Sequence, residues 1–266
     1  MAFLSVEFYS DCLKRCVDFK VVLPDGEQQT PLKALYLLHG YGNRNSEWVL
    51  NSNITEVAKK YNLCVVLPSG ENSFYLDGEA TGRKYGTFIG EELPLFVQRI
   101  LRVSSDRQDN FIGGLSMGGF GAIHTALQFP NRFGKLFAFS SALIVSEVMK
   151  MEEGGGNAVA NEAYFRLMFG KEELLEHGDS NPEELVRRIK EQNAPMPEMY
   201  LACGTEDFLI QENRHFHEFL QKKEVEHVYH ESKGAHDFVF WNEYLEPAVQ
   251  WLMGSSEEKI DENNSI

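Results

Sequence analysis

The stretch FIGGLSMGGFG (111–121) places Ser116 between Gly114 and Gly118. A strand-like apolar run precedes the serine, and a helical pattern at 117–129 follows it. The motif G-x-S-x-G in this context is typical of a nucleophile elbow, where the serine has a strained backbone and glycines leave room for the crossing chain. A flexible glycine-rich loop is the alternative, but a loop requires neither the strand nor the helix. The stretch therefore predicts a nucleophilic Ser116 at a helix N-terminus, where backbone amides favour developing negative charge.

Strand-like and helix-like patterns alternate along the rest of the chain, which predicts an α/β protein. The predicted strands are 6–10, 17–24, 34–40, 63–68, 110–116, 135–141, 199–205 and 225–232. The predicted helices are 55–61, 88–101, 117–129, 211–223 and 238–252. The first two strands alternate apolar and polar residues, as in an antiparallel edge hairpin, whereas the middle strands are apolar throughout, as in a parallel sheet covered on both faces. We expect a mostly parallel central sheet with an antiparallel N-terminal hairpin and helices on both faces.

One segment interrupts this alternation. From about 143 to 196 the chain carries three consecutive glycines and two helical stretches, 161–170 and 182–192. An insertion of this length at the carboxyl edge of a sheet is typical of a lid. With 43% hydrophobic residues, the chain has enough apolar side chains for one large core, so we expect a single domain over 1–253. The polar, acidic tail 254–266 is expected to be unstructured.

Charge and hydropathy argue against several kinds of partner. The formal net charge of −15 at pH 7 repels a phosphate backbone, so nucleic acid is not expected as a partner. The beginning of the chain lacks a secretory pattern, and no run of about 18 apolar residues occurs, so we expect a cytoplasmic protein without a membrane partner.

The four cysteines do not form a metal-binding pattern. Cys64 and Cys203 fall in strand-like runs, where a thiol acts as a small apolar group. Cys12 and Cys16 could form a metal pair, but no second pair of suitable spacing occurs. We expect neither a metal nor another cofactor.

A nucleophilic serine requires a general base and an acid that orients it. In strand-turn-helix architectures of this kind the acid comes first and the histidine last, each just beyond a strand end. Asp207 follows the seventh predicted strand, and His236 lies in the loop after the eighth. Glu206 is the rival acid. The alternative for His236 is a surface-loop histidine, and Asp237 beside it could cap the following helix. The predicted triad is Ser116, His236 and Asp207.

A tetrahedral intermediate also requires two backbone donors for its oxyanion. The amide of Met117, next to the nucleophile, is one candidate. The loop after the third predicted strand supplies the other; the Tyr41 amide is the first choice and the Gly40 amide the rival.

Four motifs together resemble one family, the esterase D branch of α/β hydrolases, especially its tributyrin-esterase-like members. They are LYLLHGYGNRNSEW (35–48), FIGGLSMGGFGA (111–122), ACGTEDFL (202–209) and GAHDFVFW (234–241). The resemblance covers nearly the whole chain, and the motifs occur in the order of the family. It implies the α/β-hydrolase fold and a serine carboxylesterase of short acyl esters that requires no cofactor, with Ser116, Asp207 and His236 as the triad.

The resemblance leaves the substrate open. Relatives include S-formylglutathione hydrolases, feruloyl and acetyl-xylan esterases and mycolyltransferases, and a homo-oligomer is a further expectation from the family. Where relatives often carry Trp-Tyr-Thr-Asp after the fourth strand, this chain has FYLD at 74–77. We expect Gly40, Trp48 and Tyr75 to contribute to the substrate pocket. The alternative from another class is a non-catalytic protein of the same fold that only binds a ligand.

Overall fold

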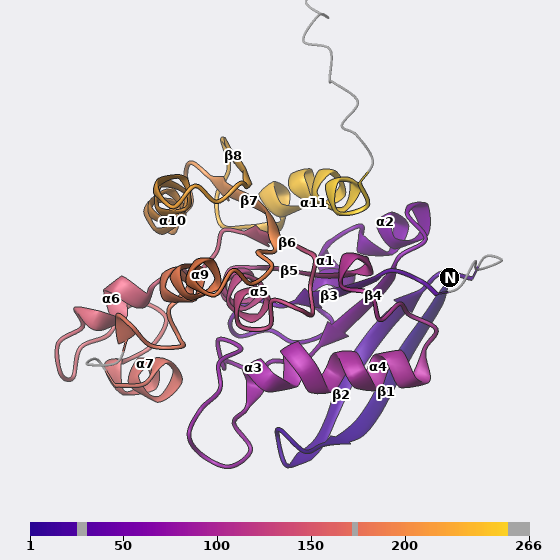
Figure 1. The fold of residues 1–266 in the computed structure, drawn as a ribbon, viewed down its shortest axis with the longest axis horizontal. Coiled ribbons are helices and arrows are strands. Elements are labelled where there is room, and N and C mark those ends of the chain that lie inside the picture. The colour runs from indigo at the N-terminus through magenta and orange to yellow at the C-terminus, as the bar shows by residue number, and fades with distance from the viewer. Residues whose placement is uncertain (26–30, 172–174, 255–266) are drawn as a thin grey trace, which may run out of the picture.

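The computed structural model describes residues 1–25, 31–171 and 175–254. Within them, eight strands form one sheet in the order β1-β2-β4-β3-β5-β6-β7-β8, with helices on both sides (Figure 1). The predicted acidic tail lies outside the described residues except for Gly254.

All eight predicted strands are confirmed within a few residues. The strands are β1 (Ala2–Ser10), β2 (Arg15–Leu23), β3 (Ala34–Leu38), β4 (Cys64–Pro68), β5 (Asn110–Leu115), β6 (Lys135–Phe139), β7 (Glu198–Gly204) and β8 (Val228–Ser232). β1 pairs antiparallel with β2, and β2 pairs antiparallel with β4. The remaining neighbours are parallel, so the predicted mixed sheet with an N-terminal hairpin is confirmed.

The predicted helices are also present. The longer helices are α2 (Ile54–Lys60), α4 (Leu93–Ile100), α5 (Met117–Gln128), α7 (Glu162–Phe169), α9 (Pro182–Glu191), α10 (Ile210–Lys222) and α11 (Phe238–Leu252). The shorter ones are α1 (Glu47–Asn51), α3 (Tyr85–Thr87) and α6 (Val145–Met149), together with a π-helical turn at Phe88–Glu92 and a 3₁₀ turn at Arg107–Asp109. The helix predicted at 88–101 thus begins with a π-helical turn. α1 and α6 were not predicted, because five residues are too few for a helical apolar pattern.

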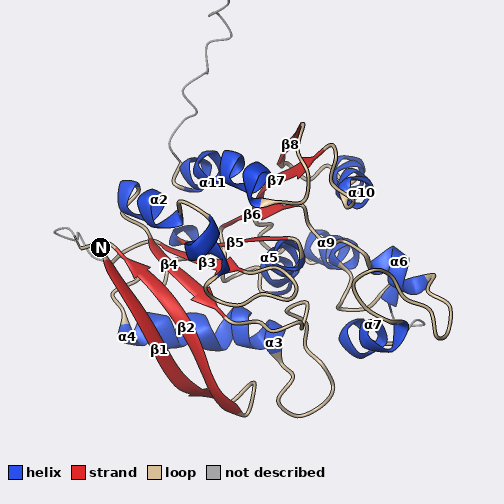
Figure 2. Ribbon diagram, turned by 180° about the vertical axis from the view of Figure 1, so that it is seen from behind, coloured by secondary structure: helices blue, strands red, loops and turns tan. Residues whose placement is uncertain are grey.

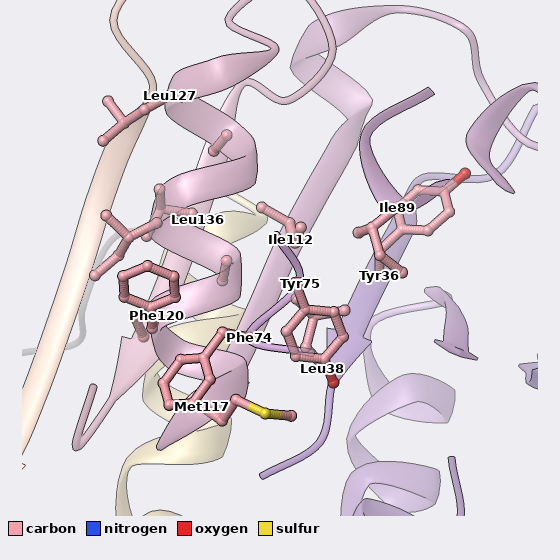
Figure 3. Packing of buried hydrophobic residues seen from close by; sticks show 14 of the residues in the cluster. Tyr36, Leu38, Phe74, Tyr75, Ile89, Ile112, Met117, Phe120, Leu127 and Leu136 are labelled. Carbon is pink, nitrogen blue, oxygen red and sulfur yellow. The ribbon is translucent and has the colours of Figure 1, made fainter. Parts of the chain in front are cut away.

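Two apolar layers cover the two faces of the sheet. Successive side chains of a strand point to opposite faces, and β3 shows this directly: Tyr36 and Leu38 belong to one buried cluster, and Leu35 and Leu37 to the other. Helices α2 and α11 cover one face, whereas α4, α5 and α9 cover the other (Figure 2). Figure 3 shows the second layer, where Phe120 of α5 belongs to the same cluster as Tyr36 and Leu38 of β3.

The segment 143–196 follows β6, at the carboxyl edge of the parallel strands. It contains α6, α7 and α9, which lie together on one side of the molecule, and α9 packs against α5 (Figure 1). Met168 and Phe169 of α7 are buried in the core, whereas Leu167 is 62% exposed. Of the apolar residues in this helix, Phe165 is the one that borders the cavity described below.

Candidate active site

Ser116 occupies the sharp turn between β5 and α5. Its φ of 52° and ψ of −119° lie in a region of backbone conformation that residues other than glycine rarely adopt. A Cβ atom on Gly114 would lie 2.3 Å from the carbonyl oxygen of Gly118, and one on Gly118 would lie 2.5 Å from that of Leu38. Glycine is therefore required on both sides of the serine, because the backbone segments touch. The geometry is that of a nucleophile elbow.

A continuous chain of hydrogen bonds connects Ser116, His236 and Asp207. The distance from Ser116 Oγ to His236 Nε2 is 3.0 Å. On the other side of the ring, His236 Nδ1 lies 2.8 Å from Asp207 Oδ2 and 3.0 Å from Oδ1. Because ionised Asp207 can only accept, it holds the proton on Nδ1 and leaves Nε2 as the acceptor for the serine hydroxyl. The structure thus brings together the three side chains of the predicted triad.

The ends of β7 and β8 fix the acid and the histidine relative to each other. The amide of Glu206 donates to the carbonyl of Gly234 at 2.9 Å, which ties the loop before His236 to the turn after β7. Asp207 is 3% exposed, whereas the rival acid Glu206 is exposed. Asp237 accepts from two amides at the start of α11, so it caps this helix, as the sequence suggested.

The environment of Asp207 favours its charged form. Burial alone raises the pKa of this carboxyl, but the hydrogen bond and charge of His236, with the Leu209 amide and the Ser140 hydroxyl, outweigh burial and lower it below its ordinary value. The Leu209 amide donates to Asp207 Oδ1 at 2.8 Å. Asp207 therefore stays ionised and is suited to hold a protonated imidazole.

Two aromatic rings border the imidazole. Phe208 lies 4.5 Å from His236 between ring centroids, and Trp241 lies 5.0 Å away with its ring nearly perpendicular. The indole of Trp241 donates to Ser140 Oγ at 3.0 Å, which fixes that ring. Phe208 is 67% exposed, so an apolar surface flanks the histidine at the mouth of the site.

In the loop after β3, the Tyr41 amide has no acceptor among the described residues, whereas the amides on either side of it are bonded. The Gly40 amide donates to Glu47 Oε2 at 2.7 Å, and the Gly42 amide donates to Asn72 Oδ1 at 2.7 Å. Within the described part of the chain, no acceptor is found for the amides of Tyr41 and Met117. Because its amide is already bonded, Gly40 is not available as the second donor. The geometry therefore favours the Tyr41 amide over the Gly40 amide as the second oxyanion donor.

His39 holds the peptide that joins Gly40 to Tyr41, and Glu47 holds the preceding peptide through the Gly40 amide. His39 Nε2 accepts from the Gly70 amide at 2.8 Å, so Nδ1 carries the proton and donates to the Gly40 carbonyl, also at 2.8 Å. In a trans peptide the N–H points opposite to the C=O, so this bond turns the Tyr41 amide away from His39. Burial lowers the pKa of His39 to about 4, which keeps the ring neutral.

Glu47 is a functional candidate that the sequence did not indicate. It is 6% exposed, and burial raises the pKa of its carboxyl, although the Gly40 amide opposes the shift. Its second oxygen accepts from Asn43 Nδ2 at 2.6 Å. Glu47 begins the short helix α1, which was not predicted, so nothing in the pattern placed its carboxylate beside the loop.

Two cavities meet at Ser116 and Tyr41. The first, here called the insertion-side cavity, has a volume of about 210 Å³. It is lined by Tyr41, Phe74, Ser116, Met117, Ala142, Ile144, Glu147, Asn157, Ala158, Val159, Phe165, Phe208, Leu209 and Glu212. The second, the histidine-side cavity, is wider, about 510 Å³. It is lined by Gly40, Tyr41, Asn43, Glu47, Asn51, Leu115, Ser116, His236, Asp237, Phe238 and Trp241.

The expected pocket residues are only partly at these cavities. Gly40 lines the histidine-side cavity, but Trp48 and Tyr75 line neither. Trp48 is 1% exposed and donates to the Leu38 carbonyl, whereas Tyr75 is fully buried and donates to the His39 carbonyl. Both are core residues, because each ring packs inside and its polar atom is bonded to backbone. Phe74, the neighbour of Tyr75, lines the insertion-side cavity instead.

The described residues contain no group of three or more His, Cys, Asp or Glu side chains arranged to hold a metal ion. In the same part of the chain, no helix combines the length and apolar character needed to cross a bilayer.

Comparisons with known proteins agree with this geometry. The sequence pattern that defines the Esterase family matches residues 10–252. An acetyl esterase of Caldicellulosiruptor saccharolyticus is 38% identical over 262 residues, which cover 95% of this chain and 98% of the relative. Two solved Staphylococcus aureus structures cover 95% of this chain and 98% of their own. They are the fluorophosphonate-binding serine hydrolase FphF, with a TM-score of 0.85 and 25% identity, and the S-formylglutathione hydrolase FrmB, with 0.83 and 26%. The chain belongs to the Esterase family of α/β hydrolases and is a serine carboxylesterase.

Proposed function

We propose that this esterase hydrolyses short acyl esters with Ser116 as the nucleophile. His236 takes the hydroxyl proton as Ser116 attacks the carbonyl carbon, and then gives that proton to the leaving alcohol. Water attacks the resulting acyl-enzyme with the same histidine as the base. Asp207 holds the imidazole and stabilises its charged form. The single observation that carries the proposal is the unbroken hydrogen-bond chain from Ser116 Oγ through His236 to Asp207.

The amides of Met117 and Tyr41 are proposed to bind the oxyanion of the tetrahedral intermediate. Met117 is the first residue of α5, so its amide lies at the positive end of the helix dipole. The neighbouring amides of Gly40 and Gly42 are already bonded, which supports Tyr41 as the second donor. Such donors stabilise charge that develops only in the transition state.

We assign the two cavities to the two halves of the ester. The leaving oxygen must receive its proton from His236, and His236 lines only the histidine-side cavity of the two. The alcohol therefore departs through that cavity, which carries Asn43 and Asn51 in its wall. The acyl group occupies the insertion-side cavity, where Phe74 and Phe165 supply apolar walls.

The volume of the acyl cavity supports a short acyl group. At about 210 Å³ it is smaller than the 300–1,000 Å³ pockets that hold drug-sized ligands. A formyl group, with a single carbon, leaves most of this volume empty, which favours an acetyl-to-butyryl ester over an S-formylglutathione thioester. The acetyl esterase named above supports the short end of this range.

Replacement of Ser116 tests the proposal. Ser116→Ala is expected to lower kcat/KM for p-nitrophenyl butyrate on the order of a thousandfold or more. A fluorophosphonate probe should label the wild type with one equivalent, at Ser116, and leave the variant unlabelled. Activity of the variant comparable to that of the wild type would refute the role of Ser116, and an unlabelled, inactive wild type would favour the ligand-binding alternative.

Three further properties are also proposals. The segment 143–196 acts as a lid, which is supported by the insertion-side wall formed by Glu147, Asn157 and Phe165. The protein is cytoplasmic, which is supported by four free cysteines. A homo-oligomer is supported only by the family, and size-exclusion chromatography with light scattering tests it.

A further inference from the structure

Tyr164 of α7, in the insertion, contacts the loop after β3 in two ways. Its ring lies edge-on to the ring of Tyr41, with 5.7 Å between the centroids and 85° between the planes. Its hydroxyl donates to the carbonyl of Asn72 at 2.5 Å, and Asn72 Oδ1 accepts from the Gly42 amide at 2.7 Å. One side chain of the insertion therefore touches Tyr41 directly and reaches the next residue, Gly42, through Asn72.

The bond from Asn72 completes the restraints on the Tyr41 amide. Both polar backbone groups of Gly40, which precedes Tyr41, are bonded as described above. On the other side, Asn72 supplies the acceptor for the amide of Gly42, which is exposed. Since a residue has only two soft backbone dihedrals, fixing the peptides on both sides of Tyr41 fixes the direction of its N–H.

Tyr164 holds Asn72 by its carbonyl. Among the described residues, no other group donates to that carbonyl. Tyr164 is half-buried, and its ring also lies 6.4 Å from that of Phe74 between centroids, so the side chain has little freedom. Without the hydroxyl, the peptide that follows Asn72 loses a restraint, and the amide side chain of the same residue turns with it.

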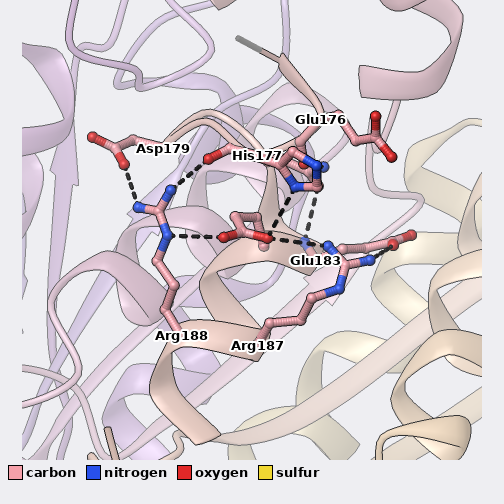
Figure 4. A network of polar contacts seen from close by, with 8 residues as sticks. Glu176, His177, Asp179, Glu183, Arg187 and Arg188 are labelled. Carbon is pink, nitrogen blue, oxygen red and sulfur yellow. Dashed lines mark hydrogen bonds and ion pairs between the residues drawn. The ribbon is translucent and has the colours of Figure 1, made fainter. Parts of the chain in front are cut away.

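The insertion is held in place independently of the Tyr164 hydroxyl. On α9, Arg188 pairs with Asp179, which fixes the end of the preceding loop (Figure 4). His124 of α5 donates to the Asp179 carbonyl at 2.7 Å and ties the same loop to the core. The neighbours of Tyr164 that anchor α7 by burial are Phe165, Met168 and Phe169. Loss of one hydroxyl should therefore leave the insertion in position.

Tyr164 also stands apart from the substrate space. Among the described residues that line the two cavities at Ser116, Tyr164 does not occur. Its removal therefore takes no group from either wall, and an effect of Tyr164 on the reaction must pass through the loops that it contacts.

We propose that Tyr164 is a positioning residue for the oxyanion donor. Its ring against Tyr41 and its hydroxyl on Asn72 hold the Tyr41 amide in the direction that stabilises the transition state. This inference rests on the proposed function, in which Tyr41 supplies the second oxyanion amide. It gives the insertion a part in catalysis in addition to its place in the wall of the acyl cavity.

Two substitutions separate the hydroxyl from the ring. Tyr164→Phe keeps the ring and removes one hydrogen bond, so kcat for p-nitrophenyl butyrate should fall by about twofold to tenfold. Tyr164→Ala removes the ring contact as well and should lower kcat further. In both variants KM should change little, and the affinity for an alkyl boronic acid, which forms a tetrahedral adduct with the serine, should fall in parallel with kcat. Complete labelling by a fluorophosphonate should still reach one equivalent, which shows that the loss occurs in each active site.

A double-mutant cycle tests the route through Asn72. Asn72→Ala removes the acceptor of the Gly42 amide but keeps the carbonyl to which Tyr164 donates. Adding Tyr164→Phe to Asn72→Ala should then have almost no further effect on kcat, because the hydroxyl no longer has an acceptor side chain to hold. Asn72→Asp keeps an acceptor and should retain most of the wild-type kcat. Losses from Tyr164→Phe and Asn72→Ala that simply add would contradict the route.

Tyr85→Phe is the matched control. The Tyr85 hydroxyl donates to Glu71, the residue before Asn72, at 2.6 Å. Its loss perturbs the same loop without touching either bond of Asn72, so kcat should stay within about twofold of the wild type.

Three results would overturn the inference: an unchanged kcat in both Tyr164 variants, a loss confined to KM, or an equal loss in Tyr85→Phe. Failure of the proposed function gives a different pattern. If Tyr41 is not the donor, Glu47→Ala, which frees the Gly40 amide, also leaves kcat unchanged. If only this inference fails, Glu47→Ala lowers kcat while the Tyr164 variants do not.

Discussion

Glu47→Ala tests how the loop after β3, which carries the proposed oxyanion donor Tyr41, is held in place. The substitution removes the acceptor of the Gly40 amide, at 2.7 Å, and the partner of Asn43 Nδ2, at 2.6 Å. A buried amide left without an acceptor costs about 1–3 kcal/mol, which corresponds to a factor of about 5 to 150 in a conformational equilibrium. The loop is therefore expected to leave the conformation that presents the Tyr41 amide to the oxyanion.

The expected result is a fall in kcat with little change in KM. Complete loss of one oxyanion donor lowers kcat by about 10²–10³, and this sets the upper limit. We expect Glu47→Ala to lower kcat by about tenfold to a hundredfold. KM should change little, because the donor acts mainly on the transition state. The affinity for an alkyl boronic acid, which forms a tetrahedral adduct with the serine, should fall in parallel.

Two further variants serve as controls. Asn43→Ala leaves the bond between Gly40 and Glu47 intact, so its kcat should fall less. Glu47→Gln keeps an acceptor for the Gly40 amide and should lie between the wild type and Glu47→Ala. A kcat for Glu47→Ala within about twofold of the wild type, or a loss confined to KM, would refute this explanation of the loop.

Two other predictions follow from the histidines of the site. Asp207→Asn should lower kcat by a factor on the order of 10⁴, because an amide donor disfavours the tautomer of His236 that accepts from the serine. Glu206→Gln should differ little from the wild type, so steady-state kinetics of the two variants decides which residue is the acid. His39 is neutral in the folded state, with a pKa of about 4, but takes up a proton near pH 6.5 in the unfolded chain, so stability should fall as the pH falls from 6.5 towards 4. Between pH 6.5 and pH 5 this group should lower the free energy of unfolding by about 1.5 kcal/mol. Urea unfolding at the two pH values should show this loss, and His39→Gln should show a smaller one.

The sequence predicted the sheet and the three triad residues because their signals are local. Each parallel strand is a short apolar run, and Ser116, Asp207 and His236 each follow such a run. The carboxyl ends of parallel strands meet at one edge of the sheet, so residues far apart in the chain were expected to lie together. The observed distances between the three side chains agree with that expectation.

Only the tertiary structure decided which residues surround the serine. Phe74 and Tyr75 are adjacent, both have positive φ, of 52° and 55°, and both are buried in the same core cluster. Phe74 nevertheless lines the insertion-side cavity, whereas Tyr75 does not. The Gly42 amide finds its acceptor thirty residues away, on Asn72, and Glu212 reaches the same cavity from α10. Sequence periodicity tells which face of an element is buried, but it carries no information about loops whose conformation is set by hydrogen bonds between distant segments. The serine turn and the three triad positions were therefore predictable from the sequence, whereas the walls of the adjoining cavities and the supports of the loop after β3 required the fold.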